Sequence, residues 1–275
     1  MISLRNLSLH YNHTHGVHRV LQGISLDIRD GEYVALMGAN GSGKTSLARC
    51  LNGILKPSAG EVWVDGMSTA SSEHLQEIRR RVGMVFQQPE NQIVAPIVER
   101  EIAFGLENLG LLRDEMRRRV EEMLQRFELA RYRHQAPNQL SGGEKQRLAL
   151  AAIMAMRPRC VIFDEPTSLL DYPHRLRLFQ TIADLRRENQ QRYGSSMTVL
   201  LITQFPEEAL YAERLLILHQ GELVMDGSPL EILQQTEALD RIGLQAPLEL
   251  RAYDYLRVHS DQGLALDDFL LEPPL

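Results

Sequence analysis

The sequence lacks the features that mark several common classes of protein. Only two cysteines, Cys50 and Cys160, occur in 275 residues, and their wide separation argues against a disulfide framework or a metal-binding cysteine cluster. The longest apolar run, residues 148–156, is about half of the ~20 residues that a membrane-spanning helix needs. No charged-then-apolar leader opens the sequence. We therefore expect a cytosolic protein that reaches any membrane only through a partner.

An excess of positive charge is also missing. The chain carries 30 Lys and Arg against 36 Asp and Glu, a formal net charge of -6 and a pI near 5.9. This balance argues against a nucleic-acid binder that relies on overall basicity. Arginine runs at residues 79–81 and 117–119 are interleaved with Glu and Met, and we interpret them as solvated helix faces.

What is present is the pattern of an α/β protein. Alternating polar and apolar residues at 2–10 and 20–28 predict two antiparallel strands joined by a histidine-bearing loop. Further strands then alternate with helices, which predicts a parallel sheet covered on both faces. These strands are expected at residues 32–37, 61–64, 82–86, 160–164, 197–203, 214–219 and 222–225. The helices are expected at residues 44–55, 72–81, 97–108, 113–128, from 142 onward, at 173–188 and at 206–212.

Two segments depart from this alternation. A mostly helical insertion interrupts it at about residues 88–140. Beyond residue 228 the sheet pattern stops, and we expect a small helical appendage over 228–275, with one helix at 246–259.

The segment GANGSGKT at residues 38–45 matches the phosphate-loop pattern G-x-x-x-x-G-K-[ST]. It lies between a predicted buried strand and a helix, which is the context that such a loop requires. Backbone N–H groups in the loop and the helix N-terminus would face phosphate oxygens. Lys44 could reach the β- and γ-phosphates, and Thr45 could hold Mg²⁺. The alternative is a glycine turn with an incidental Lys-Thr.

An apolar strand at residues 160–164 ends in two acids, Asp164 and Glu165. The carboxyl ends of parallel strands are where such sheets bind ligands. We expect Asp164 to hold Mg²⁺ and Glu165 to polarise an attacking water. A solvated strand end is the alternative.

The segment LSGGEKQR at residues 140–147 opens a helix. Ser141 and Glu144 fit a capping box. Gly142 and Gly143 in the first turn cost roughly 1 kcal/mol each relative to alanine. Bare glycine amides at a helix N-terminus form an anion site, which gives this cost a reason.

Together these three motifs resemble those of ATP-binding cassette (ABC) ATPase subunits, over about residues 1–227. The resemblance implies a P-loop NTPase core with an antiparallel β subdomain, a helical subdomain at about residues 88–156 and a C-terminal helical extension at 228–275. It also implies that two subunits enclose two ATP molecules, so that Ser141 and Gly143 contact the γ-phosphate held by the partner.

The resemblance extends to single positions. Tyr11 falls where the family stacks an aromatic ring on adenine, a strand-end tyrosine being the alternative. Gln87 resembles the glutamine that senses Mg²⁺ and the membrane partner, and residues 168–171 resemble the loop that crosses the dimer interface. The implied metal ligands are Thr45, Gln87 and Asp164, and the implied catalytic residues are Glu165, Gln204 and Gln87. The remaining implied nucleotide contacts are Gly38, Asn40, Gly41, Ser42, Gly43, Lys44, Thr45, Ser46, Ser141, Gly142 and Gly143.

Two further segments, FQQPENQ at residues 86–92 and VEREIAFGLENLG at 98–110, resemble the ATPases of energy-coupling factor (ECF) transporters. This implies an importer subunit that couples ATP and Mg²⁺ chemistry to uptake of a vitamin or a transition-metal ion. The implied partners are a second ABC ATPase subunit, identical or different, and integral membrane T- and S-components, at the cytoplasmic side of the inner membrane. A soluble ABC ATPase and a slow-hydrolysing nucleotide-binding regulator are the alternatives.

One residue departs from the family pattern. The strand predicted at 197–203 should be followed by a histidine that contacts the γ-phosphate, but the residue is Gln204. Glutamine keeps a neutral N–H donor and cannot become cationic. We therefore predict that hydrolysis at this chain's own site is slowed but not abolished. A heterodimer, in which this chain lends its LSGGEKQR segment to a better-equipped partner, is the alternative explanation.

Four histidines, His10, His13, His15 and His18, lie close together in the sequence. Histidine is a common ligand of Zn²⁺ and related ions, but a site needs converging side chains. Side chains on a strand alternate in direction. A hydrated surface loop is therefore the preferred interpretation, with metal binding as the alternative.

Overall fold

A six-stranded sheet in the order β10-β9-β3-β8-β7-β6 forms the centre of the computed structural model, which describes residues 1–13 and 16–252. The strands are parallel except for β10, which pairs antiparallel with β9. They are β3 (Tyr33–Met37), β6 (Val82–Val85), β7 (Cys160–Asp164), β8 (Thr198–Ile202), β9 (Arg214–His219) and β10 (Glu222–Gly227). The α/β fold expected from the alternation of strands and helices is confirmed.

Both faces of this sheet are buried, and the strands show it residue by residue. In β3, Tyr33, Ala35 and Met37 belong to one hydrophobic core, whereas Val34 and Leu36 belong to the other. Successive strand side chains point to opposite faces, so a strand covered on both sides must be apolar throughout. The first core is covered by helices α3 (Val98–Asn108), α4 (Arg113–Arg126), α5 (Gly142–Ala155) and α6 (Tyr172–Tyr193).

The second core lies between the central sheet, α1 (Lys44–Leu51) and a four-stranded antiparallel sheet. That sheet has the order β2-β1-β4-β5, with β1 (Ile2–His13), β2 (Gly16–Ile28), β4 (Ala59–Val64) and β5 (Met67–Ser68). The two-residue strand β5 was not predicted. Helix α2 (Ser72–Arg81) follows it and leads into β6.

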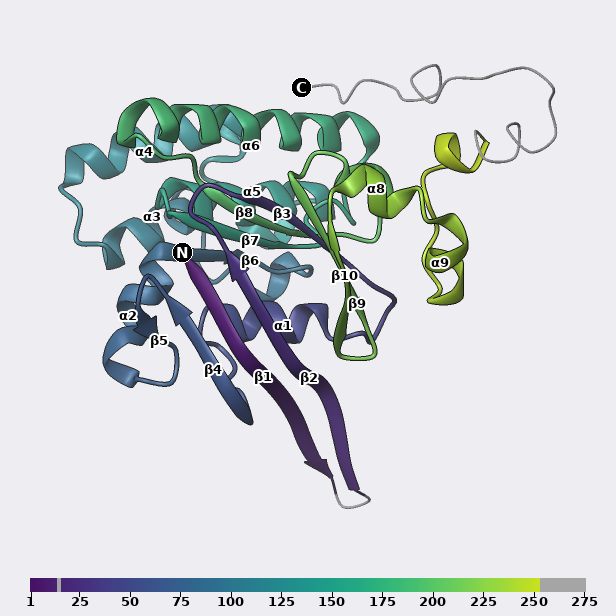
Figure 1. Cartoon of the computed structure of the whole chain (residues 1–275). Helices are drawn as coiled ribbons and strands as arrows, with labels where there is room; N and C mark the ends of the chain where they lie inside the picture. The colour runs from purple at the N-terminus through teal and green to yellow at the C-terminus, as the bar shows by residue number, and fades with distance from the viewer. Residues whose placement is uncertain (14–15, 253–275) are drawn as a thin grey trace.

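The paired strands β1 and β2 form a long arm that reaches away from the helices (Figure 1). The sequence predicted strands that stop at residue 10 and restart at 20, but pairing continues through His10↔Arg19, Tyr11↔His18 and His13↔Gly16. The expected histidine loop is therefore mostly strand, because the backbone hydrogen bonds of a hairpin continue to its tip. Residues 14–15 lie outside the described part, and the residues described contain no cluster of three or more potential metal ligands.

The C-terminal segment begins with two short helices, α8 (Pro229–Leu233) and α9 (Thr236–Arg241). Ile232, Leu233 and Leu239 are buried in the first core, so this part of the appendage packs on the central α/β body. The helix expected at 246–259 starts as predicted near Pro247, whose carbonyl accepts from Arg251 N–H. Its remainder, from residue 253, lies outside the described residues.

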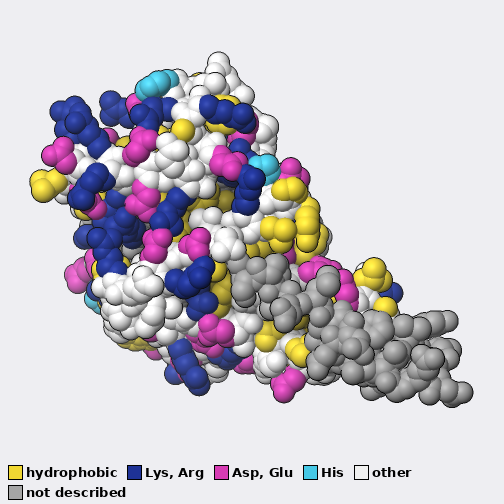
Figure 2. All heavy atoms as spheres, turned by 90° about the horizontal axis from the view of Figure 1, so that it is seen from above, with side chains coloured by type: hydrophobic (Ala, Val, Ile, Leu, Met, Phe, Trp, Pro, Cys, Tyr) yellow, Lys and Arg dark blue, Asp and Glu magenta, His cyan; other side chains and the backbone are white. Residues whose placement is uncertain are grey.

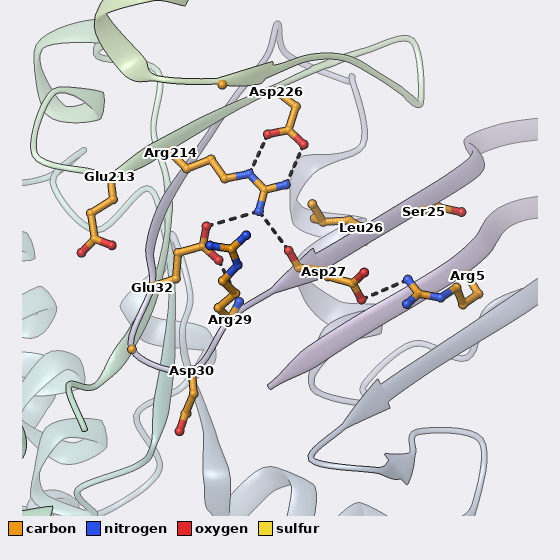
Figure 3. A pocket seen from close by; sticks show the side chains of 12 residues that line it. Arg5, Ser25, Leu26, Asp27, Arg29, Asp30, Glu32, Glu213, Arg214 and Asp226 are labelled. Atoms are coloured by element: carbon orange, nitrogen blue, oxygen red, sulfur yellow. Dashed lines mark hydrogen bonds and ion pairs between the residues drawn. The ribbon is translucent and has the colours of Figure 1, made fainter. Parts of the chain in front are cut away.

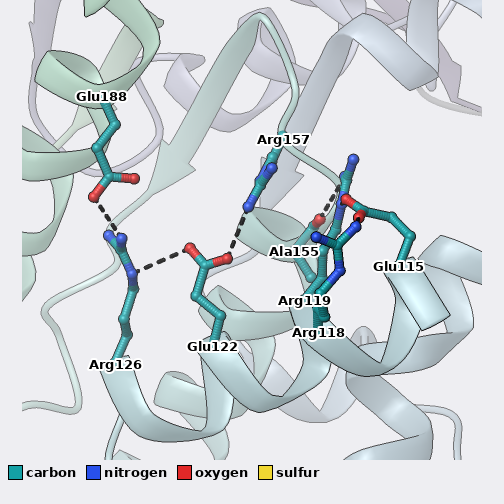
Figure 4. A network of polar contacts seen from close by, with 8 residues as sticks. All are labelled: Glu115, Arg118, Arg119, Glu122, Arg126, Ala155, Arg157 and Glu188. Carbon is teal, nitrogen blue, oxygen red and sulfur yellow. Dashed lines mark hydrogen bonds and ion pairs between the residues drawn. The ribbon is translucent and has the colours of Figure 1, made fainter. Parts of the chain in front are cut away.

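Ion pairs fasten α4 to its neighbours (Figure 4). Arg126 bonds to Glu188 of α6, and Glu122 bridges Arg126 and Arg157. Arg119 is only 15% exposed and donates to the carbonyl of Ala155. The arginine run 117–119 was expected to be a solvated helix face. It is not wholly solvated, since Arg119 is largely buried and its guanidinium bonds to the end of α5.

A second polar network joins the two sheets at the edge that precedes β3 (Figure 3). It lines a cleft of about 740 Å³. The guanidinium of Arg214 makes two bonds of 2.6 Å to the carboxylate of Asp226 and reaches Glu32 at 3.2 Å and the Asp27 carbonyl at 3.0 Å. A bidentate pair of this kind fixes geometry as well as charge. It holds β9 and β10 against the start of β3.

The surface seen in Figure 2 carries Lys and Arg side chains among Asp and Glu, without a large field of one sign. Within residues 1–13 and 16–252, no helix combines the length and the apolar character that crossing a bilayer requires.

Candidate nucleotide-binding site

Three of the predicted site segments follow neighbouring parallel strands. Loop 38–43 follows β3, Glu165 follows β7 and Gln204 lies two residues after β8. The register pairs Leu36 with Ile202 and Asp164 with Ile202. The carboxyl ends of these strands therefore meet at one edge, which is the edge where ligands bind to such sheets.

The loop at 38–43 leaves room only for glycine at critical positions. A Cβ atom at Gly38 would lie 2.2 Å from the Leu218 carbonyl oxygen, and one at Gly43 would lie 2.8 Å from the Val20 carbonyl oxygen. The hydroxyl of Ser42 is buried without a hydrogen-bond partner among the described residues. A cradle that only glycine fits, with an unpaired buried donor, suits a phosphate group.

Lys44 follows this loop at the first position of α1. Its Nζ donates to the carbonyls of Gly38 at 2.7 Å and Ala39 at 3.1 Å. Burial lowers the pKa of Lys44, whereas the nearby charges of Glu165 and Asp164 oppose that shift. The ammonium group is thus held at the loop, next to the position where a bound phosphate would lie.

Thr45 and Asp164 form a pair of oxygen ligands beside Lys44. The hydroxyl Oγ1 of Thr45 donates to Asp164 Oδ1 at 3.1 Å. Burial raises the pKa of Asp164, and the hydrogen bond from Thr45 opposes this rise. A hydroxyl and a carboxylate are ligands that suit Mg²⁺. A bound cation would favour the ionised carboxylate, so the two residues fit the metal.

Gln87, also expected near the metal, lies elsewhere in the site. Its Nε2 donates to Glu165 Oε2 at 2.9 Å. No hydrogen bond joins it to Thr45 or Asp164 within the described part of the chain. Its role as a metal ligand stays a prediction.

Glu165 is held from both sides by amides. Gln87 bonds to one carboxylate oxygen, and Gln204 Nε2 donates to the other, Oε1, at 2.6 Å. Its backbone has a φ of 51°, a left-handed conformation that is uncommon outside glycine. The N–H of Glu165 donates to the Ile202 carbonyl at 3.0 Å, and Ser168 Oγ donates to the Glu165 carbonyl at 3.0 Å. These contacts fix the direction of the carboxylate.

Gln204 connects Glu165 to the phosphate loop. The same Nε2 atom donates to Asn40 Oδ1 at 3.0 Å. Both protons of one amide group are thereby used. Gln204, the residue that departs from the expected pattern, is thus in contact with Glu165, the expected general base.

A buried acid supports the turn that carries Gln204, and the sequence analysis missed it. Thr203 Oγ1 donates to Glu208 Oε2 at 2.5 Å and accepts from the Phe205 N–H at 3.0 Å. Burial raises the pKa of Glu208, while the hydrogen bond from Thr203 and the charge of Arg175 oppose the rise. The sequence clue to this buried acid was the position of Glu208 beside the buried Ala209 in the short helix α7 (Pro206–Ala209).

The LSGGEKQR segment forms the N-terminus of α5, with the capping box expected from its sequence. Ser141 Oγ accepts from the Glu144 N–H, the Glu144 carboxylate accepts from the Ser141 N–H, and Tyr132 donates its hydroxyl to Glu144. Ser141 and Gly142 are exposed. No hydrogen bond joins residues 141–143 to residues 38–46 of the same chain, as far as the structure describes it.

The other expected contacts are dispersed. Ser46 lies on α1 next to Thr45, and Gly41 has open space beside its Cα. Tyr11 is 40% exposed on the β1–β2 arm, opposite His18. It makes no hydrogen bond with the phosphate loop among the described residues, and its stacking role stays a prediction.

A phosphate loop that only glycine fits, a strand-end Asp-Glu pair and an exposed glycine-rich helix N-terminus on one α/β fold define a P-loop nucleoside triphosphatase of the ATP-binding cassette class. The family model described as "ABC transporter" matches residues 21–168. The chain is 45% identical over 248 residues to the energy-coupling factor transporter ATP-binding protein EcfA1 of Clostridium novyi (strain NT), covering 90% of this chain and 86% of that protein. It is also 45% identical to the cobalt import ATP-binding protein CbiO of Syntrophus aciditrophicus (strain SB), covering 90% and 85%.

A solved structure agrees. The dimeric post-hydrolysis state of the ATP-binding cassette MJ0796 bound to ADP and Pi superposes with a TM-score of 0.75 at 30% identity, covering 83% of this chain and 99% of that one. The chain belongs to the ABC transporter ATP-binding family, within the group of energy-coupling factor ATPases. It is an ATPase that uses ATP with Mg²⁺.

Proposed function

We propose that this chain hydrolyses ATP to drive uptake of a micronutrient, a transition-metal ion or a vitamin, through separate membrane proteins of an ECF-type importer. The observation that carries the catalytic part is the Glu165 carboxylate, held by Gln87 and Gln204 beside Lys44. The relatives named for transport and cobalt import support the transport part.

In the proposed reaction, the loop at 38–43 and Lys44 bind the β- and γ-phosphates. Mg²⁺, held by Thr45 and Asp164, would neutralise developing charge on the phosphate oxygens. Glu165 accepts a hydrogen bond from water and directs it at the γ-phosphate in line with the leaving oxygen. Gln204 and Gln87 keep the carboxylate in that direction. Ser141 and Gly143 contact the γ-phosphate bound by the opposite subunit.

The chain would act as a peripheral subunit on the cytoplasmic side of the membrane, bound to an integral T-component near residues 87–92, while an S-component selects the substrate. In this proposal, residues 1–227 form the ATPase domain, about 88–156 its helical subdomain and 228–275 a C-terminal extension. The buried Ile232, Leu233 and Leu239 indicate that the extension starts as part of the same packed body.

The test is purification of the tagged chain from detergent-solubilised membranes, followed by reconstitution of the complex in vesicles. The proposal expects integral membrane subunits to co-purify and substrate uptake to require ATP inside the compartment that holds this chain. Recovery of an active ATPase without any membrane subunit would favour the soluble ABC alternative. A complex that binds ATP but hardly hydrolyses it would favour the regulator.

A further inference from the structure

Arg175 lies where two functional loops of the same chain approach each other. It is half-buried on the second turn of α6. Its guanidinium carbon lies 4.1 Å from the centre of the Phe205 ring, and its Nε donates to the Leu170 carbonyl at 3.0 Å. Phe205 directly follows Gln204, and Leu170 belongs to loop 168–171. One side chain thus contacts both loops.

Each loop continues into a different nucleotide-contacting segment. On one side, Gln204 bonds to Asn40 of the phosphate loop and to Glu165. On the other side, a Cβ built at Gly143 would lie 3.4 Å from the Leu169 carbonyl oxygen and 3.8 Å from Leu170. Loop 168–171 therefore packs directly against the N-terminus of α5.

We propose that Arg175 is a positioning residue that sets loop 168–171 and the N-terminus of α5 relative to Gln204, and so controls hydrolysis at the opposite subunit's ATP site, which this chain completes. The inference rests on the proposed function, because residues 141–143 act on the opposite subunit's ATP only in the dimer described above. Residues 38–45 and 165 serve this chain's own ATP. Arg175 is placed to connect the geometry of one site to that of the other.

The chemistry requires arginine at this position. A guanidinium is planar, so it stacks on the Phe205 ring with its face while Nε donates in its plane. Lysine has a point charge and cannot do both. Loss of the stacked pair and of one hydrogen bond should reduce turnover by about three- to tenfold, given the usual strengths of these contacts.

The test isolates the site that this chain completes in trans. In the assembled complex, this chain carries Glu165→Gln, so that hydrolysis reports the opposite subunit's site alone. The opposite subunit is either a second copy of this chain, selected by its own tag, or a distinct ATPase subunit. Arg175→Leu, Arg175→Lys and Phe205→Leu are then added to the Glu165→Gln chain. Arg187→Leu is the matched control, since Arg187 lies on the same helix in an exposed ion pair with Asp184. In the mirror arrangement, Arg175→Leu is placed in a chain with intact Glu165, and the opposite subunit's corresponding glutamate is changed to glutamine.

The proposal expects Arg175→Leu in trans to lower kcat by about three- to tenfold, with the KM for ATP within about twofold because no ATP contact is removed. The kcat of Arg175→Lys and that of Phe205→Leu should each lie between those of the Arg175→Leu chain and the Arg187→Leu control. In the mirror arrangement, Arg175→Leu should lower kcat less than it does in trans. Equal losses of kcat in the two arrangements would overturn the proposal. It would also be overturned if Arg175→Leu keeps its thermal unfolding midpoint and its kcat in trans equals that of the Arg187→Leu control. If the unsubstituted complex hydrolyses no ATP, the proposed function itself is refuted.

Discussion

Removing the amide of Gln204 is the perturbation that isolates the unusual feature of this site. In Gln204→Ala, the Glu165 carboxylate loses the donor at 2.6 Å and keeps only Gln87 at 2.9 Å. Asn40 loses its partner at 3.0 Å. Lys44, Thr45 and the glycine loop remain, so ATP binding should be nearly unchanged.

The size of the effect follows from the kind of bond. A hydrogen bond to a charged group contributes about 1.5–3 kcal/mol, and each 1.36 kcal/mol corresponds to a tenfold change in rate. The Gln204 side chain is exposed, so water can replace part of the lost contact, and the lower end of the range applies. We expect kcat to fall by about tenfold and the KM for ATP to change by less than about threefold.

The assay is steady-state phosphate release by the purified complex, with ATP varied at saturating Mg²⁺. Gln125→Ala is the control, because Gln125 also donates its amide to a glutamate, Glu121 at 3.0 Å, but on the exposed surface of α4. An unchanged kcat in Gln204→Ala would refute the reasoning. So would a loss that appears only in KM.

Three further predictions concern neighbouring residues. Gln204→His should raise turnover, because a histidine can become cationic toward the γ-phosphate; equal or lower phosphate release would mean that Gln204 is adapted to this site. Burial raises the pKa of Glu208 above 4.5, so the folded protein holds this proton more tightly than the unfolded chain, and stability should fall as pH rises through the raised pKa. Glu208→Gln should therefore gain stability relative to the unsubstituted chain as pH rises above about 4.5, measured by urea unfolding; a difference that stays constant with pH would contradict this. Gly38→Ala places a Cβ 2.2 Å from the Leu218 carbonyl oxygen and should cost about 1–3 kcal/mol of nucleotide binding through displacement of the loop, measured with a fluorescent ATP analogue; unchanged affinity would show that the loop adapts freely.

The sequence was most informative where a local pattern forces a local structure. The strand at Cys160–Asp164 and the start of α1 at Lys44 were predicted to the residue, because apolar runs and the glycine loop bound them tightly. The arm of β1 and β2 was predicted too short, since polar residues in a two-stranded ribbon carry no burial signal. Its pairing comes from backbone bonds between residues 10–13 and 16–19.

The site was predictable as a set of residues but not as a network. Motif spacing places the loop that leads to Lys44 after one strand and Glu165 and Gln204 after two others. It does not show that one amide of Gln204 joins Asn40 to Glu165, or that Arg175 stacks on Phe205. Those contacts join residues separated by 30 to 164 positions, so only the folded sheet brings them together. The proposed contacts of residues 141–143 with nucleotide need a second subunit.

The central claim is that Glu165, oriented by two glutamines, makes this chain's own site hydrolytic although it lacks the family's histidine. Single-turnover hydrolysis of labelled ATP tests it most directly, in the complex whose opposite subunit carries the glutamate-to-glutamine substitution, with and without Glu165→Gln in this chain. The account predicts that the intact chain releases phosphate and that Glu165→Gln reduces the rate by roughly a hundredfold or more, the scale of general-base loss. Equal rates with and without Glu165, or no hydrolysis by the intact chain, would contradict it.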